Sequence, residues 1–204
     1  MKEFWDERYK GSSYVYGKEP NVYLKRKLSE LKAGSILFPA EGEGRNAVFA
    51  ASEGWEVSAF DQSSEGRKKA LLLAEEEGVE LDYQIADFQD HDPEKERFDA
   101  VALIFAHFPP QERKDYFQKL VGSLRKGGSL IFEGFGKRQL DYQRSCPSAG
   151  GPRELNLLFS EEELKETFSS LELLEFHEGE TDLHEGEFHK GKGWVIQFTA
   201  RKKA

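Results

Sequence analysis

Hydrophobic and polar positions follow two periods along the chain, one typical of strands and one typical of helices. Short apolar runs predict five strands, at residues 35–38, 56–60, 81–85, 100–105 and 129–133. Apolar residues spaced three and four apart predict intervening helices over 46–53, 63–77 and 111–125. The run at 100–105 is apolar without alternation, as expected of a strand that is covered on both faces. Strands that alternate with helices in this way favour an α/β fold around a parallel sheet.

The pattern before the first strand is helical. A short helix is predicted over residues 4–9, followed by an aromatic turn that contains glycine. A second helix is predicted from Pro20 to about Lys32, because proline is favoured in the first turn and Gly34 ends the periodic stretch.

The pattern changes after the fifth strand. Residues 136–158 are marked by glycine and proline, which predicts a long functional loop or lid. A helix over 160–169 follows, in which Ser160 and Glu163 have the spacing of a capping box. Two strands, 171–179 and 193–201, then come without a helix between them. They predict a hairpin whose last strand enters the sheet antiparallel.

The turn after the first strand carries the clearest chemical signal. Gly42 and Gly44 stand two apart, between the apolar run and the next helix. We expect glycine there because a Cβ would hold a ligand away and because the turn demands a positive φ. Asp61 ends the second strand about seventeen residues beyond Gly44, where an acid can accept hydrogen bonds from ribose hydroxyls. The arrangement indicates a nucleotide-like ligand at the carboxyl end of a parallel strand.

Two kinds of nucleotide fit this turn. Gly42, Gly44 and Ala47 also have the GxGxxA spacing of a dinucleotide-binding fold. A dehydrogenase of that type normally adds a substrate domain, and the rest of the chain is too short for an obvious one. The reversed last strand is a second feature that does not favour the dinucleotide fold.

Composition narrows the class of protein. The chain has 204 residues and a net charge of −9, without a long basic block, which argues against a nucleic-acid partner. Its longest apolar run is too short to span a bilayer and no apolar signal region is present, so we expect no membrane partner. The single cysteine, Cys146, favours a reducing, cytoplasmic setting. The oligomeric state is not readable from these features.

Length and the lack of an internal repeat or linker predict one domain over 1–204. Within it we expect a helical N-terminal lid and first helix (1–33), a cofactor-binding half (34–135) and an acceptor-side half (136–204) that contains the loop, a helix and the hairpin.

Four segments carry a resemblance to a known superfamily. They are FWDERY followed by YVYGKEPN, PAEGEGRNAVFAASEGWEVSAFDQS, IADFQD, and FDAVALIFAHFPP followed by RKGGSLIFEGFG. Over nearly its whole length the chain resembles the Rossmann-like S-adenosylmethionine-dependent methyltransferases. It looks closest to the branch of the tellurite-resistance and related small bacterial methyltransferases. The resemblance implies a three-layer sandwich with a seven-stranded, mostly parallel sheet whose last strand is antiparallel.

The resemblance also implies roles for individual residues. The loop 40–44 would pack its backbone against the methionine part of S-adenosylmethionine, Asp61 would hold the ribose, and Asp87 would accept the adenine amino group. The chain departs from the superfamily at Phe38, where an acid is common, and at Ala40, where glycine is common; Glu41 is the suggested replacement for the acid. The implied cofactor-binding residues are Tyr16, Ala40, Glu41, Gly42, Glu43, Gly44, Asn46, Asp61, Gln62, Ser63, Ala86, Asp87, Phe88, Phe105, Ala106 and His107.

The histidines leave the chemistry open. His107, after the fourth strand, is the candidate catalytic base, because imidazole titrates near neutral pH; its alternative role is to position the cofactor or a loop by hydrogen bonding. His189 is a candidate contact in the acceptor pocket. His177, His184 and His189 lack metal-ligand spacing, so no metal is predicted. The N-terminal aromatic residues, Tyr16 above all, could cover the cofactor as a lid, with core packing as the alternative.

The predicted function is methyl transfer from S-adenosylmethionine to a small-molecule acceptor by in-line displacement. The product would be S-adenosylhomocysteine. Two alternatives stay open, namely a methyltransferase that acts on a macromolecule and a non-catalytic module that binds the cofactor. The acceptor itself is not specified by the sequence.

Overall fold

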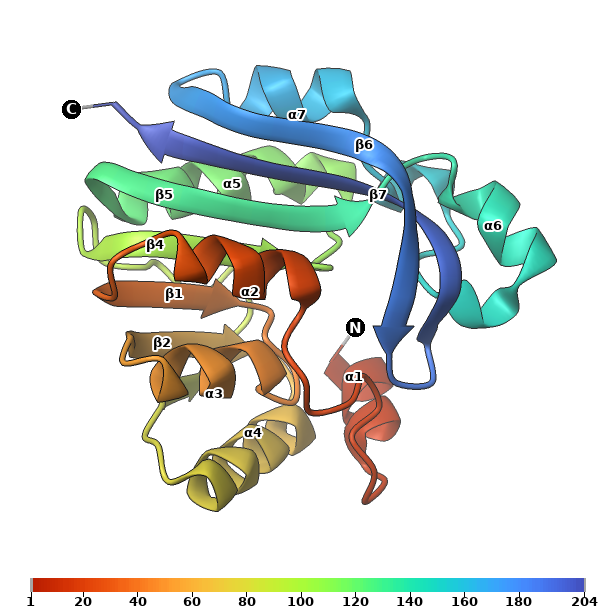
Figure 1. Cartoon of the computed structure of the whole chain (residues 1–204), viewed down its shortest axis with the longest axis horizontal. Helices are drawn as coiled ribbons and strands as arrows, with labels where there is room; N and C mark the ends of the chain where they lie inside the picture. Colours follow the sequence, from red (N-terminus) through yellow and green to blue (C-terminus); the bar gives the residue numbers. More distant parts are fainter. Residues whose placement is uncertain (1, 204) are drawn as a thin grey trace.

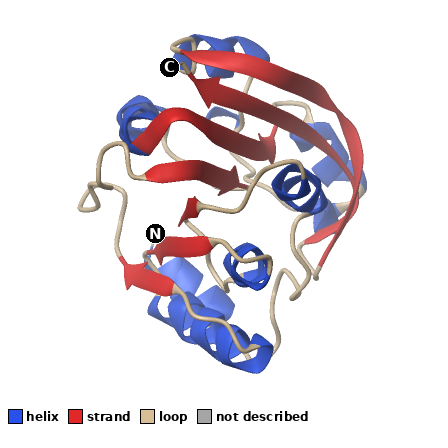
Figure 2. Ribbon diagram, turned by 60° about the vertical axis from the view of Figure 1, so that its left-hand side comes forward, coloured by secondary structure: helices blue, strands red, loops and turns tan. Residues whose placement is uncertain are grey.

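The computed structural model describes residues 2–203, so residues 1 and 204 of the predicted domain lie outside it. Helices cover both faces of a seven-stranded sheet of order β3-β2-β1-β4-β5-β7-β6 (Figure 2). The first five strands are parallel, and β7 is antiparallel to both of its neighbours. The predicted α/β class, the seven strands and the reversed last strand are confirmed. The strands are β1 (Ser35–Pro39), β2 (Glu56–Asp61), β3 (Asp82–Ile85), β4 (Phe98–Ile104), β5 (Leu124–Phe135), β6 (Leu171–Glu185) and β7 (His189–Lys202).

Apart from α6, the helices form where the apolar periodicity predicts them, with shifted ends. They are α1 (Lys2–Tyr9), α2 (Val22–Ser29), α3 (Arg45–Ser52), α4 (Ser64–Glu77), α5 (Pro110–Ser123), α6 (Gln139–Ser145) and α7 (Glu161–Thr167). The second helix begins two residues later than predicted, because the side chain of Asn21 accepts the Leu24 N–H at 2.8 Å and caps it. No helix among residues 2–203 has the length and apolar content needed to cross a membrane.

The core lies on both faces of the sheet, and successive strand residues alternate between the two. On β4, Val101 and Leu103 join a cluster with α5 and α7, whereas Ala100 and Ala102 join a second cluster with α2 and α3. Since both faces are covered, the strand must be apolar at every position, which explains its lack of alternation in the sequence. Burial on both faces fixes the central strands, and with them the edge where their carboxyl ends meet.

Two predictions about the second half of the chain were wrong in extent. The stretch 136–158 is not a plain loop: it contains α6 and two short 3-10 turns, Pro147–Ala149 and Leu155–Leu157. The hairpin strands are also longer than the predicted 171–179 and 193–201, since β6 pairs with β7 as far as Glu185 and His189. Figure 1 shows this extension bending past the carboxyl ends of the parallel strands toward α1. The extension was missed because it contains few apolar residues.

Candidate cofactor and acceptor site

The glycine loop, residues 40–44, follows β1 at the carboxyl edge of the sheet. Gly42 and Gly44 have φ of +64° and +88°, so the predicted need for positive φ is confirmed. Ala40 also lies in the left-handed region, at φ +52°, although it carries a Cβ. The expected reason for Gly44 was incomplete. A Cβ on it would come within 2.5 Å of the Ala70 Cβ on α4, so this glycine allows α3 and α4 to approach each other.

Asp61 ends β2 beside this loop and is buried. Its Oδ2 accepts the Gly42 N–H at 3.0 Å and its Oδ1 accepts the Ser63 N–H at 2.8 Å. Burial raises the pKa of Asp61 to about 6, and the two backbone hydrogen bonds offset only part of that rise. A carboxylate has about four acceptor sites, so each oxygen keeps one for a ligand hydroxyl. The neighbouring Gln62 is half-buried.

The two acids of the loop have partners within the protein. Glu41 Oε1 accepts the N–H groups of Asn46 and Ala47 at 2.9 and 2.8 Å, which caps α3. Burial raises the pKa of Glu41 to about 7. Glu43 binds Lys69 Nζ at 2.6 Å and accepts the Val15 N–H at 2.8 Å. Glu43 therefore connects the loop to α4 and to the N-terminal segment. Because both acidic side chains have partners within the protein, the backbone of the loop is the part that we predict to contact the cofactor.

The N-terminal helix α1 covers the loop from one side. The Asp6 carboxylate accepts the Ser63 hydroxyl at 2.7 Å, close to the N-terminus of α4, where Ser63 Oγ also accepts the Gly66 N–H at 3.0 Å. The Tyr9 hydroxyl lies 2.7 Å from where a Gly42 Cβ would be. Tyr9, another of the N-terminal aromatic residues, therefore contacts the glycine loop.

The three predicted cofactor residues after β3 differ in their exposure to solvent. Ala86 is half-buried, and its N–H donates to the Asp61 carbonyl at 3.0 Å. Asp87 is exposed at the start of a turn, where its carbonyl accepts the His91 N–H at 2.9 Å. Phe88 is buried against Phe60 and Phe108, with ring centroids 4.9 and 4.5 Å away. Asp87 is therefore accessible for the predicted adenine contact, whereas Phe88 acts mainly in the core.

Three of the predicted residues follow β4. Phe105 has φ +51°, and its ring lies 4.6 Å from that of Phe135 at the end of β5. Ala106 is buried in the core cluster that includes α5. His107 Nδ1 lies 2.9 Å from the Leu157 carbonyl, and the Phe135 N–H donates to its Nε2 at 3.4 Å. Burial lowers the pKa of His107 to about 3. Both nitrogens are thus engaged and the ring is neutral, which favours positioning over the predicted base role.

A buried polar network, which sequence reasoning largely missed, joins the hairpin to the parallel strands. Asn21 Nδ2 donates to Glu133 on β5 at 2.8 Å and to Glu185 on β6 at 2.9 Å. Arg45, directly after Gly44, donates to Glu185 at 2.9 Å. The N–H of Asn21 also donates to Asn46 Oδ1 at 2.9 Å. Asn21 directly before an apolar periodic helix was a readable cap signal, but nothing local in the sequence indicates its long-range partners.

The hairpin and the N-terminal segment close the carboxyl edge together. The Glu187 N–H donates to the Val15 carbonyl at 3.0 Å. The Tyr16 hydroxyl accepts from Arg8 at 3.2 Å, and its ring lies 4.7 Å from His189. The structure therefore brings Tyr16, Phe105, Phe135 and His189 together above the ends of β4 and β5.

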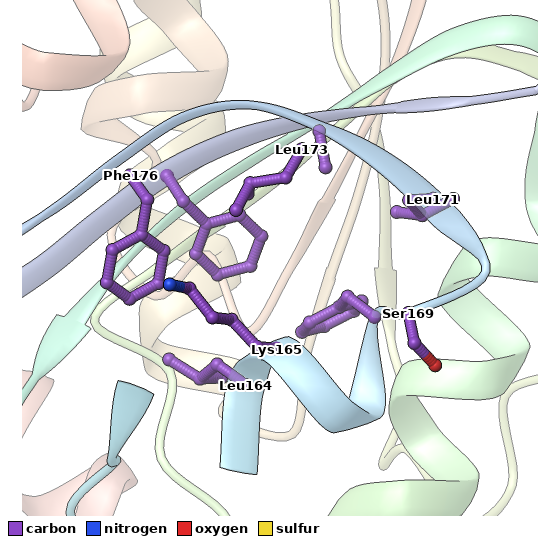
Figure 3. A pocket seen from close by; sticks show the side chains of 9 residues that line it. Leu164, Lys165, Ser169, Leu171, Leu173 and Phe176 are labelled. Carbon is purple, nitrogen blue, oxygen red and sulfur yellow. The ribbon is translucent and has the colours of Figure 1, made fainter. Parts of the chain in front are cut away.

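A hollow of about 160 Å³ lies away from this edge, between α7 and the sheet (Figure 3). Apolar side chains such as Leu164, Leu171 and Phe176 line it, with Lys165 Nζ 4.8 Å from the Phe176 ring. None of the predicted cofactor residues lines it, so it is distinct from the site at the carboxyl edge.

Comparisons with known proteins agree with this geometry. Residues 36–128 match the family model described as a methyltransferase domain. No curated protein sequence matches the chain. A solved structure described by the conversion of a disulfide bond into a thioacetal group during echinomycin biosynthesis superimposes with a TM-score of 0.78 at 21% identity, over 100% of this chain and 92% of the other.

Two further solved structures bear on the predicted superfamily. TehB from Haemophilus influenzae has a TM-score of 0.73 at 16% identity, over 99% of this chain and 67% of its own. Magnesium protoporphyrin IX methyltransferase from Synechocystis PCC 6803, solved with bound S-adenosylhomocysteine, has a TM-score of 0.70 at 14% identity, over 99% and 98%. At these identities the likeness concerns the fold alone.

The residues at the carboxyl edge fit S-adenosylmethionine. Asp61 keeps acceptor positions for a ribose diol beside the glycine loop. Phe105 and Tyr16 offer aromatic faces near the carboxyl edge, where a sulfonium would be stabilised. Residues 36–128 thus match a methyltransferase domain, and the chain as a whole has the Rossmann-like fold of solved S-adenosylmethionine-dependent methyltransferases.

Proposed function

We propose that the enzyme methylates a small-molecule acceptor at the carboxyl ends of β1, β4 and β5, beneath the tip of the β6–β7 hairpin. The observation that carries this proposal is the contact between the hairpin and the N-terminal segment. Glu187 donates to the Val15 carbonyl at 3.0 Å, and a Cβ on Gly186 would come within 2.2 Å of that oxygen. A protein or nucleic-acid acceptor would have to enter between two segments that are already in contact.

The residues at this edge of the sheet support an alignment mechanism. When bound, S-adenosylmethionine supplies an activated methyl group on a sulfonium. The protein positions an acceptor lone pair in line with that methyl and excludes water, which accounts for much of the rate enhancement in such a reaction. The rings of Phe105 and Phe135, 4.6 Å apart, support both tasks because they are rigid and apolar.

The roles of the individual residues belong to the same proposal. Asp61 would hold the ribose, the backbone of residues 40–44 would bind the methionine part, and Asp87 would accept from the adenine amino group. Glu41, which caps α3, would be the acid that binds the methionine ammonium. The acceptor would approach this edge beside the aromatic residues Tyr16, Phe105 and Phe135.

The test is a transfer assay with methyl-labelled S-adenosylmethionine. Cell extract is separated by size, and a panel of small thiols, amines, phenols and halides is assayed beside it. Label in small products with none in protein or nucleic acid is the expected result. Label in macromolecules would support the first alternative. Tight binding of S-adenosylhomocysteine without any transfer would support a non-catalytic module.

A further inference from the structure

Glu185 and His189 face each other across the turn of the hairpin. They are paired in register at the end of the β6–β7 ladder, and His189 Nδ1 lies 3.1 Å from Glu185 Oε2. Both side chains are buried. The pair therefore lies on the part of the hairpin that extends past the parallel strands.

The Glu185 carboxylate is held in its ionised form. Its Oε2 also accepts from Arg45 at 2.9 Å, and its Oε1 accepts from Asn21 at 2.9 Å. Burial alone would raise its pKa, but the positive charge of Arg45 and the hydrogen bond with His189 outweigh burial and lower the pKa to about 2. An ionised carboxylate only accepts hydrogen bonds, so His189 Nδ1 must carry the proton.

The proton on Nδ1 fixes the tautomer and leaves a lone pair on Nε2. Nε2 makes no hydrogen bond within residues 2–203, and it is not among fully buried polar atoms that lack a partner, so it keeps some exposed surface. Burial lowers the pKa of His189, and the charge of Glu185 only partly offsets this. The imidazole is therefore neutral at neutral pH and able to accept a proton.

The ring lies among residues that meet at the carboxyl edge. Its centroid is 4.5 Å from Phe105 after β4, 5.1 Å from Phe135 at the end of β5 and 4.7 Å from Tyr16 in the N-terminal segment. Arg45 connects the pair to the glycine loop, because it directly follows Gly44. The ring thus lies at the carboxyl edge, among the aromatic residues that the proposed function places beside the acceptor.

We propose that His189 is the catalytic base of the transfer and that Glu185 positions it, which makes the acceptor a neutral protic molecule such as a thiol. This rests on the proposed function. As the acceptor attacks, its S–H bond breaks and the proton moves to His189 Nε2. The electron pair of that bond stays on the acceptor and forms the new S–CH3 bond. The carbon–sulfur bond of the sulfonium breaks, and its electrons stay on the departing sulfur. Water then takes the proton from His189.

Two acceptors separate proton removal from positioning. An aliphatic thiol is protonated at neutral pH, whereas an aromatic thiol such as thiophenol is largely ionised and needs no base. His189→Asn places an amide N–H near the position of Nδ1 and keeps the contact with Glu185, but it removes the Nε2 lone pair. His177→Asn, at an exposed position on β6, is the matched control.

We expect His189→Asn to lower kcat for the aliphatic thiol by about 10²–10⁴-fold, as for loss of a general base. The rate with thiophenol and the affinity for S-adenosylhomocysteine should change little, and His177→Asn should resemble the wild type. An equal loss with both thiols, or a weakened affinity for S-adenosylhomocysteine, would mean that His189 only supports the hairpin. Transfer by the wild type to thiophenol alone would also overturn the proposal.

A measurement on the imidazole keeps the base assignment testable without any activity. In the complex with S-adenosylhomocysteine, nitrogen NMR should find the His189 proton on Nδ1, and Glu185→Gln should change that distribution. A proton on Nε2 would refute the base whatever the enzyme methylates. If the wild type transferred methyl to no member of the panel, the proposed function would fail, and this measurement would still decide the role of the pair.

The charged surroundings matter for any pH profile of the reaction. Glu133 belongs to the same network, and burial together with the charge of Glu185 raises its pKa to about 7. A Glu133→Gln variant separates its titration from that of His189, because the protonation of Glu133 is then removed. The titratable and charged groups around the ring are Arg8, Tyr16, Arg45, His107, Glu133 and Glu185.

Discussion

Substitution of Asp61 by asparagine should weaken cofactor binding without a matching loss of stability at neutral pH. The reason is that the ionised, buried carboxylate of Asp61 itself opposes folding at that pH. Its pKa rises from 3.8 to about 6, and a shift of about two units corresponds to about 3 kcal/mol. The native state binds the proton more tightly than the unfolded chain does. The contribution of Asp61 to the free energy of unfolding is therefore fully present below about pH 4, and it is lost as the pH rises through about 6.

The asparagine side chain of the Asp61→Asn variant would carry no charge, so it would avoid that loss. Its amide could accept only one of the two N–H groups that Asp61 holds, from Gly42 and Ser63, and the other would lack a partner at a cost of about 1–3 kcal/mol. We expect Asp61→Asn to be less stable than the wild type by about 1–3 kcal/mol at about pH 4, and equal or up to about 2 kcal/mol more stable at about pH 8.

Binding should change in the opposite sense at high pH. Charge-assisted hydrogen bonds contribute about 1.5–3 kcal/mol each, so the variant should bind S-adenosylhomocysteine at least about tenfold more weakly at about pH 8. Urea unfolding at both pH values and calorimetric titration measure the two effects. Unchanged affinity at high pH would refute the ribose assignment, and a stability difference that does not depend on pH would refute the electrostatic reasoning.

Asp99 provides the matched control for this experiment. It lies near the start of β4, at the opposite edge of the sheet, where its Oδ2 accepts the Ser35 N–H at 2.8 Å. The hydrogen bonds from Ser35 and the charge of Arg125 outweigh the effect of burial and lower its pKa. Asp99→Asn should therefore leave cofactor affinity unchanged and lower stability at neutral pH.

Three further substitutions, with Gly54→Ala as a control, test the packing, backbone strain and ion pairing of the site, each by urea unfolding. Gly44→Ala should lower the free energy of unfolding by about 2–5 kcal/mol, because the position has a left-handed φ and the added Cβ overpacks against α4. Gly54→Ala, at φ +86° with open space around it, should lose only the conformational part, about 1–2 kcal/mol. Equal losses would refute the packing argument. Ala40→Gly should stabilise the enzyme by about 0.5–1 kcal/mol by relieving its φ of +52°, and a loss of stability would contradict the strain. Arg45→Met should destabilise by about 3–5 kcal/mol because it leaves the Glu185 charge buried and unpaired, and a neutral outcome would show that the pair contributes little.

The sequence predicted those parts of the fold that depend on local pattern. The run 100–105 gave β4 because a strand buried on both faces is apolar throughout, and Ser63 and Gly78 marked the two ends of α4 through a side-chain cap and a left-handed residue. The spacing of Gly42, Gly44 and Asp61 likewise predicted neighbours, since consecutive parallel strands end at the same edge.

Features that depend on distant residues could not be predicted in this way. Asn21 bonds to Glu133 and Glu185, which are 112 and 164 positions away, and no local period connects them. The extension of β6 beyond Gly179 is rich in acids, so its hydrophobic pattern did not predict a strand. That pairing is held by backbone hydrogen bonds with β7 and by the buried ionic contacts at its tip.

The position of β7 between β5 and β6 has a consequence for how the enzyme is made. This strand follows both of its neighbours in the chain, so during synthesis each of them waits with an unpaired edge, a state that favours aggregation. Only the arrival of β7 brings His189 opposite Glu185. A growing chain that has not yet reached β7 therefore lacks both the paired hairpin and the contact between His189 and Glu185.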